Sequence, residues 1–373
     1  MRARRVIRGI IVLFAASTVI AGLTLMAGAG QFRRIDPHFE GRCTPIEGAV
    51  GVEDLVVTPG GRAALLASDD RRARDAASRG GIYIYSLDDG VAPRLLSGSA
   101  PASFHPHGLD LVVTPDGRGT LYVVNHELPR GAGHSIEVFD WRATPEPTLT
   151  HRATIRDPLL VSPNDVAGVD HSRFYVTNDH GAASPRAQTL EDYTRRARAR
   201  VVYHDGEETR VAADGLRYAN GIALRPDGAA LFVSSTTDRR LHVFARDRET
   251  GALSRRADVA LSTGPDNIDV EPDGTLWIAG HPKLLSFVVH ARAPGRRSPS
   301  QVLRLRPVPD EPLEFAVEEV YLDDGSELSG ASVAARRGRR LLIGGVFEPE
   351  FLDCTMDRAR AGPTVVETAM LAR

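Results

Sequence analysis

Apolar runs of strand length, separated by turn-forming residues, repeat along most of the chain. In each repeat an apolar run leads into a turn of the Pro-Asp-Gly type and a second apolar run follows, as in VVTPDGRGTLYVVN from Val112 and ALRPDGAALFVSS from Ala223. Turn residues between two strand-like runs indicate a β-hairpin. Helical periodicity is scarce in this part of the sequence, so the pattern predicts an all-β protein.

The hairpin recurs six times at a nearly constant interval of about 55 residues. Its six turns contain Gly61, Gly117, His171, Gly228, Gly274 and Gly338. A hairpin that returns at such a period is typical of a β-propeller, in which each blade has four strands. We therefore predict a six-bladed β-propeller with a central channel, occupying residues 31–373.

Two segments interrupt the repeat. Ser68–Gly81 is polar and charged and ends in two glycines, which is typical of a long surface loop. Ala187–Arg200 has the composition of a helix, with charges on most of its faces. Each segment follows the outer end of a hairpin. Either they form lids over one face of the propeller, or they are solvated insertions.

Residues 1–30 differ from the rest of the chain. Four arginines among the first eight residues precede an uncharged, mainly apolar run from Gly9 to Gly30. Such a run is long enough to cross a bilayer, which takes about 20 residues. Ala27-Gly28-Ala29 also fits a cleavage site, so residues 1–30 are either a signal-anchor helix or a cleaved signal peptide. The basic residues before the run favour an exported body, either membrane-anchored or secreted or periplasmic.

The two cysteines fit an oxidising compartment. Cys43 precedes the first repeat and Cys354 follows the last. A covalent bond at these two places would close the ring of blades; the alternative is a pair of unpaired buried thiols.

The overall charge gives no electrostatic case for nucleic-acid binding, because the formal net charge is -2. Arginine supplies nearly all the positive charge, and Lys283 is the only lysine. Asparagine is also scarce. Because the composition disfavours it, the five remaining positions are informative: Asn125, Asn164, Asn178, Asn220 and Asn267.

Polar side chains stand just before five of the six hairpins, where the innermost strand of each blade would begin. Equivalent positions in successive blades lie at the same height around a propeller axis, so these side chains would converge at the channel mouth. The alternative is that they are ordinary turn residues. The positions are Glu53, Asp54, His107, Asn164, Asp165, Asn220, Asp266 and Asn267.

The adjacent polar pairs predict two cation sites, because successive side chains of an extended strand point in opposite directions. Oxygen ligands suit a hard cation such as Ca²⁺ and disfavour Zn²⁺. Asp54 and Asp165 would hold an ion deeper in the channel, with backbone carbonyls completing its shell. The outer ion would leave places for water, phosphate or substrate beside five ligands: Glu53, Asn164, Asn220, Asp266 and Asn267.

Two histidines belong to the second repeat, His107 before its hairpin and His126 after it. A neutral imidazole is the usual general base for activating water. We therefore regard this pair as the catalytic candidates, while a structural hydrogen-bonding role explains His107 equally well and fits His126 better. His180 and His281, at analogous places in other repeats, are expected to be structural.

These motifs resemble those of the serum paraoxonase/arylesterase family of calcium-dependent lactonases. Order and spacing agree over roughly residues 40–354. The matching stretches are Glu53-Asp54-Leu55, Phe104-His105-Pro106-His107-Gly108, Val123-Val124-Asn125-His126, Pro163-Asn164-Asp165, Thr177-Asn178-Asp179-His180, Tyr218-Ala219-Asn220-Gly221-Ile222, Asp266-Asn267-Ile268 and Gly280-His281-Pro282.

The resemblance implies a six-bladed propeller with two calcium ions in the channel. It assigns the structural ion to Asp54, Asp165 and the backbone carbonyl of Leu109, and the catalytic ion to the five outer ligands named above. It gives His107 and His126 the task of activating water, and it pairs Cys43 with Cys354.

The resemblance also implies lactones as substrates, with aryl esters cleaved as side substrates, and lipid anchoring through an uncleaved signal segment. Gly280 stands where family members often carry a free cysteine, and the two interrupting segments differ in composition. Substrate identity is therefore left open.

Two other functions remain. A gluconolactonase-type propeller shares the fold and a metal held by Glu and Asn, but usually has one ion, whereas the adjacent pairs indicate two. A non-catalytic propeller that serves as a binding platform, with structural calcium, would not need the histidine pair. The absence of a Gly-X-Ser-X-Gly motif gives a serine-hydrolase mechanism no support.

Overall fold

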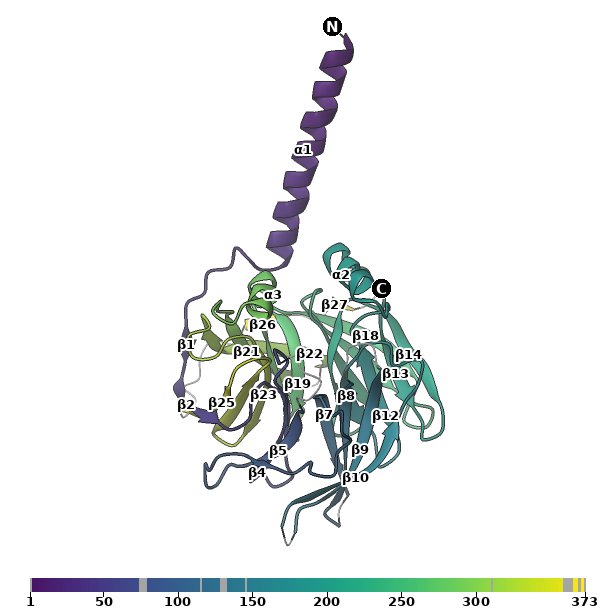
Figure 1. Cartoon of the computed structure of the whole chain (residues 1–373), viewed down its shortest axis with the longest axis vertical. Helices are drawn as coiled ribbons and strands as arrows, with labels where there is room; N and C mark the ends of the chain where they lie inside the picture. Colours follow the sequence, from purple (N-terminus) through teal and green to yellow (C-terminus); the bar gives the residue numbers. More distant parts are fainter. Residues whose placement is uncertain are drawn as a thin grey trace.

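Six antiparallel sheets, each built on four strands, form the blades of a propeller in the computed structural model (Figure 1). The structure describes residues 2–73, 79–114, 116–127, 133–144, 146–309, 311–357, 365–367 and 370–371. The repeated hairpin supplies the first two strands of every blade. The predicted six-bladed fold is therefore confirmed.

The blades are numbered along the chain, and their strands have the following bounds. Blades 1, 2 and 3 consist of β3 (Val52–Val57), β4 (Ala63–Ser68), β5 (Gly81–Ser86) and β6 (Arg94–Leu95); β7 (Pro106–Val113), β8 (Arg118–His126), β9 (His134–Arg142) and β10 (Thr148–Ile155); and β11 (Pro163–Gly168), β12 (Phe174–Asn178), β13 (Ala199–His204) and β14 (Thr209–Leu216). Blades 4, 5 and 6 consist of β15 (Ala219–Leu224), β16 (Ala230–Ser235), β17 (Arg240–Arg246) and β18 (Leu253–Ala260); β19 (Gly264–Val270), β20 (Leu276–His281), β21 (Ser300–Val308) and β22 (Glu311–Asp323); and β23 (Ala331–Arg337), β24 (Arg340–Gly345), β25 (Glu350–Met356) and β2 (Gly41–Glu47). Three short strands lengthen the outer edges of blades 5 and 4: β1 (His38–Phe39), β26 (Val365–Glu367) and β27 (Met370–Leu371).

The core lies between the blades. Each of six clusters of buried apolar side chains joins two neighbouring sheets, for example Val124 of blade 2 with Val176 of blade 3, and Phe232 of blade 4 with Phe315 of blade 5. The sheets are therefore covered on both faces. This explains why the strands read as continuous apolar runs in the sequence and not as a strict alternation.

The ring closes in blade 6, where the N-terminal strand β2 pairs with the C-terminal strand β25. Cys43 and Cys354 stand directly opposite each other in this pair and form a disulfide. The predicted bond between the two ends of the propeller is confirmed.

A single helix, α1 (Arg2–Gly28), stands away from the propeller in Figure 1. Its stretch Ile10–Gly28 is long and apolar enough to cross a membrane, and its side chains are not buried by the rest of the chain. The backbone oxygen of Ala29, just after α1, accepts a hydrogen bond from Leu284 N of helix α3 (Leu284–Arg292) at 3.0 Å. The helix and the disulfide are compatible with export.

Three features differ from the sequence-based expectation or refine it. The apolar segment that forms α3 was not recognised as helical. Helix α2 (Pro185–Thr194) confirms a helix in the second interrupting segment, but the chain has already entered β13 by Ala199. The first interrupting segment is not wholly a surface loop, because the carboxylate of Asp69 is buried and lies 3.0 Å from Nδ1 of buried His105. Residues 74–78 of that segment lie outside the described residues.

Candidate metal centre and histidine pair

The innermost strand of every blade begins with an irregular register, and the candidate residues lie there. The hydrogen-bonded register between the first two strands shifts between Val52 and Asp54 in blade 1 and between Pro106 and Leu109 in blade 2, with the same feature in the other four blades. Such a bulge adds one residue, bends the strand and redirects its side chains. Six equivalent bulges therefore surround the channel mouth.

Glycines let the inner strands approach one another at this level. A Cβ atom on Gly108 would lie 2.3 Å from Oδ1 of Asp165, and one on Gly221 would lie 2.5 Å from the backbone oxygen of Asp266. Only a residue without a side chain fits at either place. The contacts bring blade 2 against blade 3 and blade 4 against blade 5 beside the candidate ligands.

Four buried oxygens at the mouth have no hydrogen-bond partner among the residues that the structure describes. They are Oε2 of Glu53 and the Oδ1 atoms of Asn164, Asn220 and Asn267. A buried acceptor without a partner costs roughly 1–3 kcal/mol, and native proteins contain few of them. Four such oxygens among the predicted ligands fit a cation that would coordinate them.

Each asparagine is held by its amide nitrogen, which leaves its oxygen free. Nδ2 of Asn267 donates to Oε1 of Glu53 at 2.9 Å, and Nδ2 of Asn220 donates to Oγ1 of Thr236 at 3.0 Å. Nδ2 of Asn164 donates to Oδ2 of Asp179 at 3.4 Å. Asp266, the fifth predicted ligand, has Oδ2 2.9 Å from Nε2 of His281.

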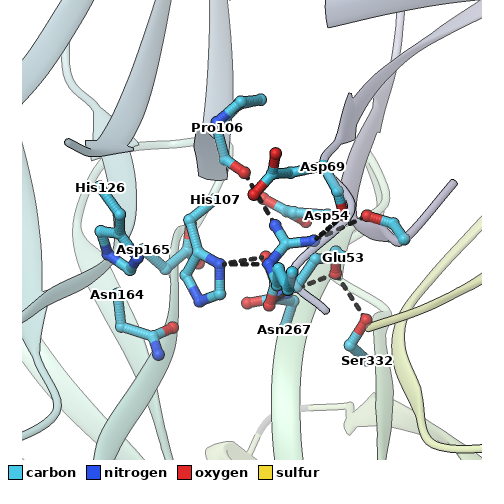
Figure 2. Close-up of polar contacts among 12 residues, drawn as sticks. Glu53, Asp54, Asp69, Pro106, His107, His126, Asn164, Asp165, Asn267 and Ser332 are labelled. Atoms are coloured by element: carbon cyan, nitrogen blue, oxygen red, sulfur yellow. Dashed lines mark hydrogen bonds and ion pairs between the residues drawn. The ribbon is translucent and has the colours of Figure 1, made fainter. Parts of the chain in front are cut away.

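Asp54 and Asp165, predicted to hold the deeper ion, lie next to these oxygens. Oδ2 of Asp54 accepts a hydrogen bond from Leu109 N at 2.7 Å, and Oδ2 of Asp165 accepts one from Ile222 N at 2.8 Å. Figure 2 shows both carboxylates beside Glu53 and Asn164. Leu109 thus contacts Asp54 through its backbone nitrogen, whereas the sequence analysis assigns a role to its carbonyl.

Burial and mutual repulsion disfavour the ionised forms of these carboxylates. Burial, followed by the charge of Asp165, raises the pKa of Asp54 well above its ordinary value, and burial does the same for Asp165. Burial and the charge of Asp266 raise the pKa of Glu53 to about 8. A divalent cation would favour the ionised forms of all three.

In the part of the chain that the structure describes, no three His, Cys, Asp or Glu side chains lie close enough to hold a metal by themselves. A cation here would therefore depend on the asparagine oxygens. Neutral oxygen ligands with a few carboxylates are typical of calcium sites.

The histidine pair adjoins the candidate outer site (Figure 2). The ring centroids of His107 and His126 lie 4.7 Å apart, and Nδ1 of His107 is 3.5 Å from Oε2 of Glu53. Nε2 of His126 lies 2.7 Å from the carbonyl oxygen of Pro163. Because a carbonyl only accepts, Nε2 of His126 carries a proton and its Nδ1 carries a lone pair when the ring is neutral.

Both rings are neutral at ordinary pH. Burial, followed by the charge of His126, places the pKa of His107 well below its usual value. Burial and the charge of His134 lower the pKa of His126 to about 4. The lone pair on Nδ1 of His126 can accept a proton, and the lone pair on Nδ1 of His107 can do so once the 3.3 Å hydrogen bond from Nε of Arg71 is released, so the arrangement suits general base catalysis.

Two residues at the mouth were missed by the sequence analysis. Arg71 donates from Nε to Nδ1 of His107 at 3.3 Å, and the ring of His134 lies 5.0 Å from that of His126. His134 pairs with His126 across β8 and β9, so strand register would have indicated it. Arg71 belongs to the segment expected to be a surface loop, and nothing in its spacing marked it.

His281 and His180 make the hydrogen bonds expected of structural residues. His281 contacts Asp266 and stacks on Phe287 of α3, with ring centroids 3.7 Å apart. Nδ1 of His180 lies 2.7 Å from Asp179, and its Nε2 lies 2.9 Å from Asp192. Since Asp192 belongs to α2, His180 joins this helix to blade 3.

Replacing His180 with glutamine is expected to flatten the dependence of stability on pH. Burial lowers the pKa of His180, but hydrogen bonds with Asp179 and Asp192 outweigh burial and raise it from 6.5 to about 10. Because the pKa is higher in the folded state, protonation of His180 stabilises the folded protein. This stabilisation is complete below about pH 6.5 and is lost as the pH rises towards about 10. The free energy of unfolding in urea, measured across this range, should fall less steeply in the variant. His171→Gln, an exposed control, should match the wild type; equal slopes in all three proteins would refute a stabilising role.

The sequence matches a known family over most of its length. Residues 75–356 match the family model described as Arylesterase. The chain belongs to the arylesterase family. Serum paraoxonase/arylesterase 2 of Rattus norvegicus is 33% identical over 316 residues, which cover 82% of this chain and 86% of that protein. Serum paraoxonase/arylesterase 1 of Homo sapiens is 33% identical over 326 residues, covering 84% and 89%. These relatives indicate that the arylesterase-family chain is a hydrolase.

Solved structures share its fold at much lower identity. A luciferin-regenerating enzyme superimposes with a TM-score of 0.53 at 11% identity, covering 88% of this chain and 97% of its own. A gluconolactonase from Xanthomonas campestris gives a TM-score of 0.50 at 18% identity, covering 87% and 99%. At such identities the likeness shows the propeller fold and nothing further.

Proposed function

We propose that this arylesterase-family protein is a calcium-dependent hydrolase that opens lactones and also cleaves aryl esters. The observation that carries the proposal is the group of four buried, unpartnered oxygens beside the ring of His107. Family membership supports ester hydrolysis, and the oxygen ligands support calcium. The physiological substrate would be a small lactone or ester. The propeller would be exported, and it would either stay anchored to the membrane by α1 or be released.

Glu53, Asn164, Asn220, Asp266 and Asn267 would hold the catalytic calcium, and Asp54, Asp165 and the Leu109 carbonyl the structural one. When bound, the catalytic ion would polarise the ester carbonyl and stabilise negative charge on its oxygen.

The residues of the chain would supply the proton transfer. Nδ1 of His107 would release the long hydrogen bond from Nε of Arg71 and accept a proton from the attacking water at the mouth. His126, oriented by its hydrogen bond to Pro163, would support that ring. The buried residues around the histidine pair would limit the access of bulk water. Exclusion of bulk water strengthens electrostatic interactions in the site.

A panel of substrates distinguishes this function from the two alternatives. Alkyl-substituted γ- and δ-lactones and phenyl acetate should be hydrolysed in calcium buffer, faster than gluconolactone. Preference for gluconolactone would favour the sugar-lactonase function. Hydrolysis of none of these would leave a non-catalytic propeller with structural calcium.

Asp54→Asn combined with Asp165→Asn is expected to remove one of two bound calcium ions. An ion present at 100 times its Kd stabilises the folded state by about 2.7 kcal/mol, so the variant should lose about this much calcium-dependent stability. Elemental analysis and urea unfolding with and without calcium provide the measurements. Asp110→Asn serves as the control, since this partly buried carboxylate on β7 accepts a hydrogen bond from Gly168 and is not assigned to either ion. A wild-type content of one ion or none would show the two-site assignment to be wrong.

A further inference from the structure

Arg71 holds a fixed position at the channel mouth. Its Nη1 donates to the backbone oxygens of Gly51 at 2.8 Å and Asp69 at 3.2 Å, and its Nη2 donates to the oxygen of Pro106 at 2.7 Å. These carbonyls come from three separate segments: the turn before β3, the chain after β4 and the start of β7. A guanidinium held from three sides has little conformational freedom left to lose when it binds a ligand.

The positive charge of Arg71 lies among neutral backbone acceptors. Among the described residues no carboxylate lies within 4 Å of its guanidinium, and the carbonyls that hold it are neutral. Its charge acts on Glu53, where it opposes the rise in pKa. Because Glu53 is a proposed calcium ligand, a bound ion would leave Arg71 uncompensated.

The guanidinium of Arg71 contacts His107 and has one N–H group left for a ligand. An arginine has five N–H groups, and four of those in Arg71 have protein acceptors, including Nδ1 of His107 at 3.3 Å. The second N–H of Nη2 has no acceptor in the described part of the chain. Charge-assisted hydrogen bonds from guanidinium to carboxylate are among the stronger hydrogen bonds in proteins.

We propose that Arg71 recognises a free carboxylate carried by the substrate, so that the preferred substrates are lactones bearing a carboxylate beside the ring. This specificity rests on the proposed lactonase function. The carboxylate takes the remaining N–H of Arg71 while the ring carbonyl faces the candidate metal centre. Hydrolysis then adds water across the acyl carbon–oxygen bond and yields a hydroxy dicarboxylate.

The test compares two lactones that differ only in charge. One is γ-butyrolactone with a carboxylate on its γ-carbon, and the other is the matching carboxamide. Wild-type kcat/KM should favour the carboxylate by about 10-fold or more, the size of one charge-assisted hydrogen bond. Arg71→Gln should abolish this preference and Arg71→Lys should keep part of it. Because the readout is a ratio within one protein sample, partial unfolding does not change it.

Arg62→Gln is the matched control, because Arg62 is an exposed arginine at the far end of the blade 1 hairpin, paired with Asp88. It should leave the ratio unchanged. A wild-type preference for the carboxamide, or an unaltered ratio in Arg71→Gln, would overturn the proposal. If Arg71→Gln weakens only inhibition by the ring-opened product and keeps the ratio, Arg71 binds the new carboxylate and not a substrate group, and the proposal is equally refuted.

A binding measurement separates this specificity from the lactonase function. The cyclopentanone analogue of the carboxylate cannot be hydrolysed, and its binding can be followed by calorimetry in calcium buffer. The wild type should bind it more tightly than the corresponding amide, and Arg71→Gln should remove the difference. That result would support the role of Arg71 even if no lactone is opened, whereas equal binding of acid and amide by the wild type would exclude it.

Discussion

Replacing His107 with glutamine is expected to lower kcat for lactone opening by about 10²- to 10⁴-fold, the usual contribution of a general acid–base catalyst. Glutamine keeps a polar side chain but has no lone-pair nitrogen that can accept a proton from water. Calcium content should stay at the wild-type level, because His107 contacts Glu53 only through Nδ1 at 3.5 Å and is not among the proposed ligands. Steady-state kinetics with elemental analysis on the same samples provide the measurement.

Two comparisons test the assignment of His107. His126→Gln should cost less, since that ring supports His107 and is fixed to the Pro163 carbonyl. Aryl esters should be less sensitive than lactones, because a phenolate leaves readily and depends less on a well-placed base. Full lactonase activity in His107→Gln would place the base elsewhere, with Glu53 or Asp266 as the candidates.

Removing the disulfide by replacing Cys43 and Cys354 with serine is expected to lower the free energy of unfolding by up to roughly 5 kcal/mol. The bond joins two residues separated by 311 positions, and a cross-link that closes so long a loop restricts the unfolded chain most. Urea unfolding of the wild type and of the double variant gives the difference. Intact mass with and without reductant confirms the oxidation state of the wild type.

The hydrogen-bonded pair β2–β25 is the alternative means of closing the ring, with register running from Gly41 opposite Met356 to Glu47 opposite Glu350. A loss of stability well below 1 kcal/mol in the double variant would show that this strand pair closes the ring by itself. The disulfide would then be a consequence of the closed fold and not a cause of its stability.

The fold was predictable because each blade repeats the same local chemistry. Gly117 and Gly228 in the turns have positive φ angles. The apolar runs beside these turns form strands whose sheets are covered on both faces. Local sequence therefore determines each hairpin, and the constant interval determines the number of blades. Helix α3 was not predicted because its apolar residues, among them Phe287 beside Phe347, fit a strand equally well.

The candidate site was predictable in part. Equivalent positions in the repeat indicated which side chains share the channel mouth, and the structure brings Glu53 and Asn267 into contact from blades 1 and 5. The strand bulges could not be predicted, since they depend on hydrogen-bond register between strands. Arg71 could not be predicted either, because the backbone carbonyls of Gly51 and Pro106, 20 and 35 residues away in the sequence, help to hold it at the mouth.

The most direct test of the account is the initial rate of lactone opening as a function of free calcium. Purified protein would be stripped with a chelator, dialysed and returned to increasing calcium, with magnesium as the comparison cation. We expect no activity after stripping and saturable recovery with calcium but not with magnesium, together with two bound calcium ions per chain. Equal rates in chelator and in calcium, or no lactone opened at saturating calcium, would contradict the calcium-dependent lactonase.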